Sequence, residues 1–259
     1  MTCREVIELL NKNFPESMAL EWDNPGLITG RMDKEVNKVY VCVDVTDDTL
    51  EEAVSLGADM IISHHPLIFR SVRKINSEDF LGRRLMKLIA NDVSYYAMHT
   101  NFDVCGMADY AASLLGLEEV APLEVIAEGD NGKLGIGSVG TFAIEKSLRE
   151  CAEAVKNAFQ IEHVLVYGNL DMKVKRVAMC PGSGKSTYKE AFDFGADVYI
   201  TGDTDHHAGI DAVAQNMAVI DGGHYGIEKI FIPYMKNFLE RETSLTVYRE
   251  EYKNPYTVV

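Results

Sequence analysis

Short apolar runs alternate with amphipathic stretches along much of the chain. The run Val-Tyr-Val-Cys-Val at residues 39–43 precedes about ten residues of helical character that end at Gly57, and a second apolar run follows at residues 60–63. Apolar runs of this length are typical of buried strands, and glycine suits the left-handed cap that ends many helices. This strand–helix–strand order predicts parallel strands with right-handed crossovers, and therefore an α/β fold.

The same pattern occurs twice. Residues 39–65 align without a gap with residues 177–203, and nine of the aligned positions are identical. Unrelated segments of this length would share roughly one or two identities. A shorter correspondence follows each copy in the same order, because His99 and Asp103 have the spacing of His224 and Glu228. The sequence therefore predicts an internal duplication with two related α/β lobes.

We expect the first lobe to span residues 1–120 and the second to span residues 121–259. The stretch 121–170 is too short for a core of its own, so no extra domain is inserted there. It contains a glycine-rich piece at residues 129–140, a predicted helix at 148–159 and a predicted strand at 163–167. Elsewhere, Thr2 and Glu5 have the spacing of a capping box, and a helix is predicted over residues 225–238.

Composition excludes several classes of protein. The net charge of −15 repels phosphate backbones, so direct nucleic-acid binding is not expected. No stretch is long and apolar enough to span a bilayer, and the first residues do not form a signal peptide. The five cysteines are odd in number and none has CxxC spacing, which favours a reduced, cytoplasmic protein.

Three groups of histidine and acidic residues close predicted strands. His64 and His65 follow the run at 60–63, His99 and Asp103 follow a run ending at residue 98, and His224 and Glu228 open a predicted helix. Each group has a simpler interpretation when taken alone. The adjacent histidines could be loop residues, Asp103 could cap a helix starting near Met107, and Glu228 could face the positive end of a helix dipole.

Taken together, the three groups favour a metal site between the two lobes. Ligands of parallel α/β proteins collect at the carboxyl ends of strands, and imidazole with carboxylate suits zinc, iron or manganese. Five ligands exceed the need of one ion, and a bridging carboxylate would bring two divalent ions together. The predicted metal ligands are His64, His65, Asp103, His224 and Glu228.

Other polar residues receive subsidiary predictions. His99 is the predicted proton carrier in catalysis. Asp203 occupies the place of His65 in the second copy, and we expect Asp203 and His207 to contact the ligands or a substrate. Residues 181–186 resemble the end of a phosphate-binding P-loop, but Met179 stands where that motif needs glycine. We therefore interpret this segment as an ordinary connection.

Several motifs in combination resemble one known family. They are Glu21-Trp-Asp-Asn-Pro-Gly-Leu27, Ser63-His-His-Pro66, His99-Thr-Asn-Phe-Asp103, Gly182-Ser-Gly184, Thr201-Gly-Asp203 and Gly223-His-Tyr-Gly-Ile-Glu228. With them the chain resembles the dinuclear metal-centre proteins called GTP cyclohydrolase I type 2 homologs, the NIF-three-like family. The resemblance implies the same five ligands, two α/β lobes without an inserted domain, a ring-shaped homohexamer and GTP as substrate.

Two functional hypotheses follow. In the first, the protein is a metal-dependent hydrolase in which metal-activated water opens a purine ring or attacks a related small molecule. In the second, it is a non-enzymatic metal-binding, regulatory or assembly protein, because no substrate subsite can be recognised in the sequence. Binding of a protein partner that survives loss of His64 and Glu228 would favour the second hypothesis.

Overall fold

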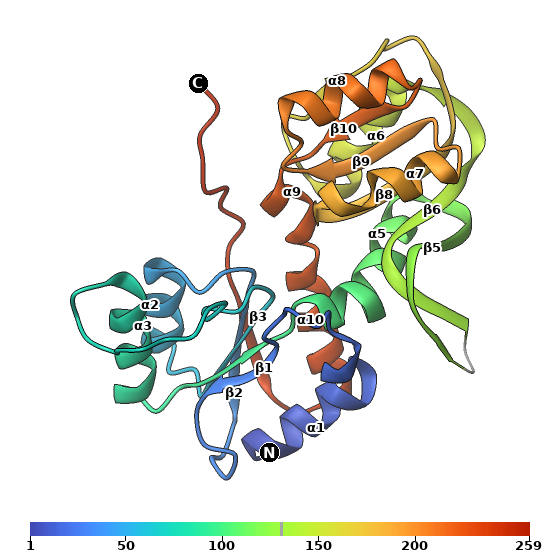
Figure 1. The fold of residues 1–259 in the computed structure, drawn as a ribbon. Helices are drawn as coiled ribbons and strands as arrows, with labels where there is room; N and C mark the ends of the chain where they lie inside the picture. Colours follow the sequence, from blue (N-terminus) through green and yellow to red (C-terminus); the bar gives the residue numbers. More distant parts are fainter. Residues whose placement is uncertain (130–131) are drawn as a thin grey trace. The chain divides into compact units, whose positions relative to one another are not determined.

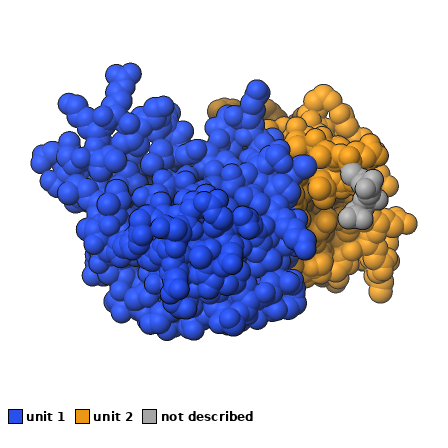
Figure 2. Space-filling view, turned by 90° about the horizontal axis from the view of Figure 1, so that it is seen from below, with its two compact units in different colours: residues 1–102, 231–253 blue, residues 103–230, 254–259 orange. Residues whose placement is uncertain are grey.

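The protein forms two compact units, each with its own sheet. The structure, a computed structural model, describes residues 1–129 and 132–259, so part of the predicted glycine-rich piece lies outside the described residues. Unit 1 contains residues 1–102 and 231–253, and unit 2 contains residues 103–230 and 254–259 (Figure 2). These units differ from the predicted lobes, because residues 103–120 belong to unit 2 and residues 231–253 to unit 1.

Unit 1 is built on a five-stranded sheet with the order β1-β4-β3-β2-β11. Figure 1 labels β1, β2 and β3 of this sheet. The strands are β1 (Gly26–Thr29), β2 (Lys38–Cys42), β3 (Met60–Ser63), β4 (Ser94–Ala97) and β11 (Thr246–Arg249). All pairs are parallel except that of β1 with β4. The helices are α1 (Cys3–Asn13), α2 (Asp47–Ser55), α3 (Phe80–Ala90), α4 (Thr100–Phe102) and α10 (Phe231–Glu242), with a 3-10 turn η1 (Glu16–Met18).

Unit 2 contains a six-stranded mixed sheet with the order β5-β6-β8-β9-β10-β7. Its strands are β5 (Leu117–Gly129), β6 (Gly132–Ser147), β7 (Leu165–Tyr167), β8 (Lys173–Ser183), β9 (Val198–Gly202) and β10 (Ala218–Asp221). Only β8, β9 and β10 pair in parallel. The helices are α5 (Ala108–Leu115), α6 (Leu148–Phe159), α7 (Tyr188–Asp193), α8 (His206–Ala214) and α9 (His224–Glu228), with the turns η2 (Asp103–Met107) and η3 (Gly184–Thr187).

The two units share a βαβ core with the same register, as the duplication predicts. Val39 of β2 pairs with Met60 of β3, and the aligned residues Val177 and Val198 pair in the same way. An aspartate that is identical in the two copies also has the same role in both. Asp59 accepts backbone hydrogen bonds from residues 37 and 38 at 2.9 and 3.0 Å, and Asp197 accepts them from residues 175 and 176 at 2.8 Å each. The predicted α/β fold is confirmed.

The third strands of the two cores also correspond. The amide of Met98 donates to Ser63 O at 2.8 Å, and the amide of Gly222 donates to Thr201 O at 2.9 Å. One additional residue, Gly223, then precedes the histidine in unit 2. The two copies differ more in the connection before this strand, because 35 residues separate Ser63 from Met98 and only 21 separate Thr201 from Gly222.

Local predictions are largely confirmed. The capping box at the start of α1 is present, with Glu5 N donating to Thr2 Oγ1 at 3.2 Å and Thr2 N donating to Glu5 Oε2 at 2.7 Å. Gly57 and Gly195 both adopt positive φ angles, +67° and +66°, after their helices. Helix α6 has the predicted bounds. All five cysteines are free, and in the part of the chain that the structure describes no helix could cross a membrane.

One local prediction is wrong. The helix expected over residues 225–238 is interrupted, because α9 ends at Glu228 and α10 begins at Phe231. Pro233 explains the interruption, since it cannot donate to the carbonyl four residues earlier and its ring displaces that carbonyl. The described part of the glycine-rich piece lies in β5 and β6, which pair as a long hairpin and are the longest strands of unit 2.

Candidate metal site

Three imidazoles converge at one edge of the unit 1 sheet. His64 and His65 follow β3, and His99 follows its parallel neighbour β4, so the carboxyl ends of both strands bring them to the same edge. One ring nitrogen from each histidine lies within 4.8 Å of those from the other two. The ring centroids are 4.9 to 5.5 Å apart. This spacing is compact enough for the three side chains to share one ion.

The turn after β3 allows adjacent histidines to face the same region. The amides of His64 and His65 donate to Cys42 O at 3.2 Å and to Val43 O at 2.9 Å. The carbonyl of His65 accepts hydrogen bonds from the Ser63 and Tyr95 hydroxyls at 2.7 and 2.9 Å. Ser63 and Tyr95 are buried, so this turn is held from the core side.

Each imidazole is oriented through its Nδ1 atom. The Nδ1 atoms of His64, His65 and His99 lie 2.9 Å from Met98 O, 2.9 Å from an Asp44 carboxylate oxygen and 2.8 Å from an Asp23 carboxylate oxygen, respectively. A carbonyl oxygen only accepts, so Nδ1 of His64 carries the proton and its ring lone pair is on Nε2. Metal-binding histidines are commonly held in this way.

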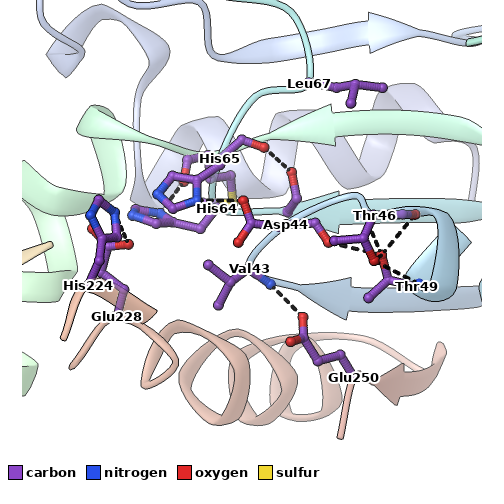
Figure 3. A network of polar contacts seen from close by, with 12 residues as sticks. Val43, Asp44, Thr46, Thr49, His64, His65, Leu67, His224, Glu228 and Glu250 are labelled. Carbon is purple, nitrogen blue, oxygen red and sulfur yellow. Dashed lines mark hydrogen bonds and ion pairs between the residues drawn. The ribbon is translucent and has the colours of Figure 1, made fainter. Parts of the chain in front are cut away.

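A buried carboxyl group holds the segment that orients His65. Glu250, which follows β11, accepts a hydrogen bond from Val43 N at 2.9 Å (Figure 3). Asp44, the residue after Val43, is hydrogen-bonded to His65 Nδ1. Glu250 is only 6% exposed, whereas glutamate is rarely buried without a partner. Burying a carboxylate is costly unless it is hydrogen-bonded. Glu250 therefore fixes the position of the 43–44 segment that orients His65.

Asp23 is the most strongly held acid beside the imidazoles. Its side chain is fully buried and accepts from His99 Nδ1 at 2.8 Å, from Thr100 N at 2.9 Å and from the Thr100 hydroxyl at 2.5 Å. Burial alone would raise the pKa of Asp23, but the hydrogen bonds from His99 and Thr100 lower the pKa to about 2. Asp23 therefore stays ionised and holds His99 in one orientation.

The low pKa of Asp23 predicts a pH-dependent loss of stability. A folded-state pKa below the unfolded value of about 3.9 stabilises the protein above that pH, and this contribution disappears as pH falls towards 2. It amounts to about 2 kcal/mol. The difference in unfolding free energy between wild type and Asp23→Asn should shrink by that amount between pH 5 and pH 2. Asp33→Asn, at a side chain that is 83% exposed, serves as the control and should show no such change in thermal or urea unfolding.

In unit 2, an imidazole and a carboxylate face each other across one helical turn. His224 and Glu228 are four residues apart in α9, and His224 Nε2 lies 2.9 Å from Glu228 Oε2 (Figure 3). The other ring nitrogen, Nδ1, lies 2.7 Å from Asp203 Oδ2. Asp203 has a φ of +55°, a strained value for a residue other than glycine. The pair and its supporting aspartate have the arrangement of a metal ligand set with an orienting carboxylate.

Two glycines make room for this pair. A Cβ atom on Gly182, at the end of β8, would lie 1.9 Å from Glu228 Oε1, and one on Gly202 would lie 2.6 Å from His224 N. Gly182 also has a φ of +72°. Asp221 holds the adjacent loop by accepting from Thr204 N at 2.7 Å and from Gly223 N at 2.8 Å. The glycines therefore have steric roles in this part of unit 2.

Asp103 and Glu228 both act on the buried thiol of Cys180. It opens the π-helical turn η2, a conformation that is frequent at functional sites. Burial raises the pKa of Cys180 to about 12, and the negative charges of Asp103 and Glu228 both contribute to the rise. Unit 2 therefore holds Asp103 and Glu228 on two separate elements, η2 and α9, with a common effect on this thiol.

The predicted ligands are thus divided between the two units. Unit 1 supplies His64 and His65, and unit 2 supplies Asp103, His224 and Glu228. Imidazole nitrogen and carboxylate oxygen both suit zinc, iron and manganese, so the donors of each unit fit divalent ions. His207 is exposed in the first turn of α8, with its ring 5.3 Å from that of His206. Its predicted role stays a prediction.

Several orienting residues could not be identified from the sequence. No motif in the sequence assigns an orienting role to Asp23, Asp44, Glu250 or Asp221. Asp23 does lie within residues 21–27, one of the motifs that resemble the family. The glycines had a visible signal, the Gly-x-Gly at residues 182–184. The sequence predicts an ordinary connection at this Gly-x-Gly. The structure has the 3-10 turn η3 there, with Gly184 N donating to Thr201 Oγ1 at 2.9 Å.

The sequence matches known proteins along nearly its whole length. A family model described as Duf34/NIF3 (NGG1p interacting factor 3) matches residues 1–255. A protein of Clostridium acetobutylicum named GTP cyclohydrolase 1 type 2 homolog is 32% identical over 241 residues, which cover 92% of this chain and 89% of that protein. One of the same name from Streptococcus pneumoniae is 34% identical over 238 residues, covering 90% of this chain and 88% of that protein.

Solved structures with the same fold are also known. A Bacillus cereus protein related to NIF3 superposes with a TM-score of 0.93 at 25% identity, covering 100% of this chain and 99% of that chain. Reduced HcgD from Methanocaldococcus jannaschii superposes with a TM-score of 0.84 at 31% identity, covering 97% of this chain and 98% of that chain.

Proposed function

The chain belongs to the Duf34/NIF3 family, and we propose that it is a hydrolase that depends on two divalent metal ions of zinc, iron or manganese. The proposed ligands are His64, His65, Asp103, His224 and Glu228. The observation that carries this proposal is the fixed orientation of the imidazoles. Each Nδ1 atom is bonded to a carbonyl or a carboxylate, which leaves Nε2 as the ring atom for coordination.

The proposed substrate is GTP or a related heterocycle. Divalent ions in such a site lower the pKa of water and polarise a carbonyl or imine. Relatives at 32% and 34% identity carry the name GTP cyclohydrolase 1 type 2 homolog, which supports hydrolytic opening of the imidazole ring of guanine. The residues of this chain supply the orientation of the ligands and the transfer of protons.

His99 is the proposed proton carrier. Its ring lies beside His64 and His65, with its Nδ1 held by the buried Asp23. An imidazole oriented by an ionised carboxylate can accept a proton at Nε2 and later return it. Asp23 keeps its charge at neutral pH because its pKa is about 2, so it holds the His99 ring in one orientation for such a transfer.

Replacing His99 should separate proton transfer from metal binding. His99→Gln is expected to lower metal-dependent hydrolysis by roughly 100-fold, the usual contribution of a general acid or base, while the metal content stays near that of wild type. Elemental analysis and initial rates on the same preparations measure both quantities. If metal is lost together with activity, His99 is a ligand, as the three-histidine distances also permit.

The proposed activity is tested with metal-loaded protein. Protein stripped by a chelator and reloaded separately with zinc, iron or manganese is incubated with GTP and with a panel of cyclic amides and phosphoesters. Ring opening is followed by loss of the guanine absorbance and by mass spectrometry. Turnover that requires metal supports the proposal, whereas loaded protein that converts no compound contradicts it and favours the non-enzymatic alternative.

We also propose that the protein assembles as a homohexamer, as its resemblance to the family implies. Light scattering coupled to size exclusion should give six times the mass of one chain. A monomer or dimer at micromolar concentration would contradict this proposal and leave the metal-site proposal unaffected.

A further inference from the structure

Two exposed aromatic side chains stand beside His99 in unit 1. The ring centroids of Trp22 and Phe69 are 5.8 and 5.6 Å from that of His99, and both rings meet the imidazole edge to face. Trp22 is 63% exposed and Phe69 is 52% exposed. Large aromatic side chains normally bury their area, and exposed ones next to a group of reactive side chains indicate a surface that a ligand covers.

The segments that carry these aromatics are held in place. Asn24 Nδ2 donates to Ile68 O at 2.7 Å, which ties the residues after Trp22 to the residue before Phe69. Asp23, between Trp22 and Asn24, is anchored in the interior through His99 and Thr100. Both aromatic rings therefore keep a defined position relative to the imidazoles, as a binding surface requires.

The segment that follows Phe69 is basic, although the whole chain is acidic. Residues 66–77 contain Arg70, Arg73 and Lys74 and no acidic residue, in a protein with a net charge of −15. All three side chains are exposed, and among the described residues the structure shows no ion pair for any of them. Arginine in particular binds phosphate groups through paired hydrogen bonds.

We propose that this surface binds a nucleoside phosphate. The planar base would stack on Trp22 and Phe69 beside His99, and Arg70, Arg73 and Lys74 would contact its phosphate groups. The proposal rests on the proposed function, because it assigns the residues that would bind the nucleotide substrate of the same site. Aromatic stacking explains recognition of a heterocycle, and the basic segment explains a preference for a nucleotide over the free nucleoside.

The only tryptophan of the chain, Trp22, reports on binding directly. The complete protein, stripped of metal so that no turnover occurs, is titrated with GTP, guanosine and inorganic triphosphate while tryptophan fluorescence is recorded. We expect GTP to quench the fluorescence with saturation, guanosine to do so about tenfold more weakly, and triphosphate to leave it nearly unchanged. Equal effects of GTP and triphosphate, or no effect of any compound, would overturn the proposal.

Matched variants distinguish the two contacts. Phe69→Ala should weaken binding of both GTP and guanosine by about tenfold, and Arg70→Ala should weaken binding of GTP alone. The controls are Phe80→Ala, which removes another exposed aromatic of unit 1, and Arg4→Ala, which removes another exposed arginine. Both controls should bind like wild type. Unchanged binding in Phe69→Ala would contradict the stacking role.

Three further outcomes are informative. If Phe69→Ala lowers the mass of the assembly and nucleotides have no effect, the aromatics contact another copy of the chain and the inference fails. If the protein binds GTP at Trp22 but holds no metal, the proposed function fails and this inference stands. If metal-loaded protein is active but its tryptophan fluorescence does not respond to GTP, the proposed function stands and this inference fails.

Discussion

Glu228→Gln is expected to weaken metal binding by more than about 100-fold and to abolish metal-dependent hydrolysis. The carboxylate of Glu228 is buried and lies 2.9 Å from His224 Nε2, so it is the proposed charged ligand with the least access to water. Glutamine preserves the size of the side chain but removes the charge. Replacing residues that only support ligands already costs 10- to 100-fold in metal affinity, and a direct ligand should cost more. Titration against a competing chelator measures the affinity.

The control for this variant is Glu162→Gln. The Glu162 side chain also belongs to unit 2, but it is 92% exposed. This variant should bind metal like wild type. Circular dichroism and a melting curve of metal-free Glu228→Gln establish that the variant is folded. A folded variant that keeps wild-type affinity would show that Glu228 is not a ligand.

Gly182→Ala is expected to reduce metal binding to a similar degree without changing any proposed ligand. The new methyl group would lie 1.9 Å from Glu228 Oε1 and 3.5 Å from His224 Nε2, so the Glu228 carboxylate must move. Alanine also costs about 1–2 kcal/mol at a positive φ, here +72°. Elemental analysis of the folded variant, together with its unfolding free energy, separates displacement of the ligand from general destabilisation.

Gly195→Ala provides a closely matched control. Gly195 has nearly the same φ, +66°, but a Cβ atom there would meet no other atom within 4 Å. Both variants should lose similar stability from backbone strain, and only Gly182→Ala should lose metal. Equal metal content in the two variants would mean that the position of Glu228 does not determine metal binding.

The sequence predicted the βαβ cores because their information is local and repeated. Strand and helix patterns lie within about 25 residues in each copy. The identity of Asp59 and Asp197 reflects one shared role, because each carboxylate accepts hydrogen bonds from two consecutive backbone amides of the neighbouring chain segment. The placement of His64, His65 and His99 at one sheet edge also follows from parallel pairing alone. These predictions needed no knowledge of distant contacts.

Features that depend on distant contacts were missed. Asp23 lies 76 residues before His99, and Glu250 lies 207 residues after Val43, so neither partnership has a local pattern. Comparison of the repeats does not reveal them either. Asp44, which bonds to His65, aligns with Gly182, which makes room for Glu228. The two copies have diverged at the positions that support the imidazoles.

The β5–β6 hairpin was not predicted from the sequence, because the roles of its glycines depend on the paired strand. A Cβ atom on Gly135 would lie 1.9 Å from the backbone oxygen of Glu124 on the paired strand, and Gly137 has a φ of +63°. The register of the hairpin also shifts near this region, between Val125 and Ala127. Glycine in a strand often marks such bulges and close approaches of two backbones, and these depend on the partner strand.

Metal content per chain is the most direct test of the account. Protein purified without chelator and offered zinc, iron and manganese is analysed for bound metal, alongside a variant that combines His64→Ala with Glu228→Ala. The account predicts about two ions per wild-type chain, as in two-metal sites, and a large loss in the variant. A folded wild-type protein that holds no metal under these conditions would contradict the account.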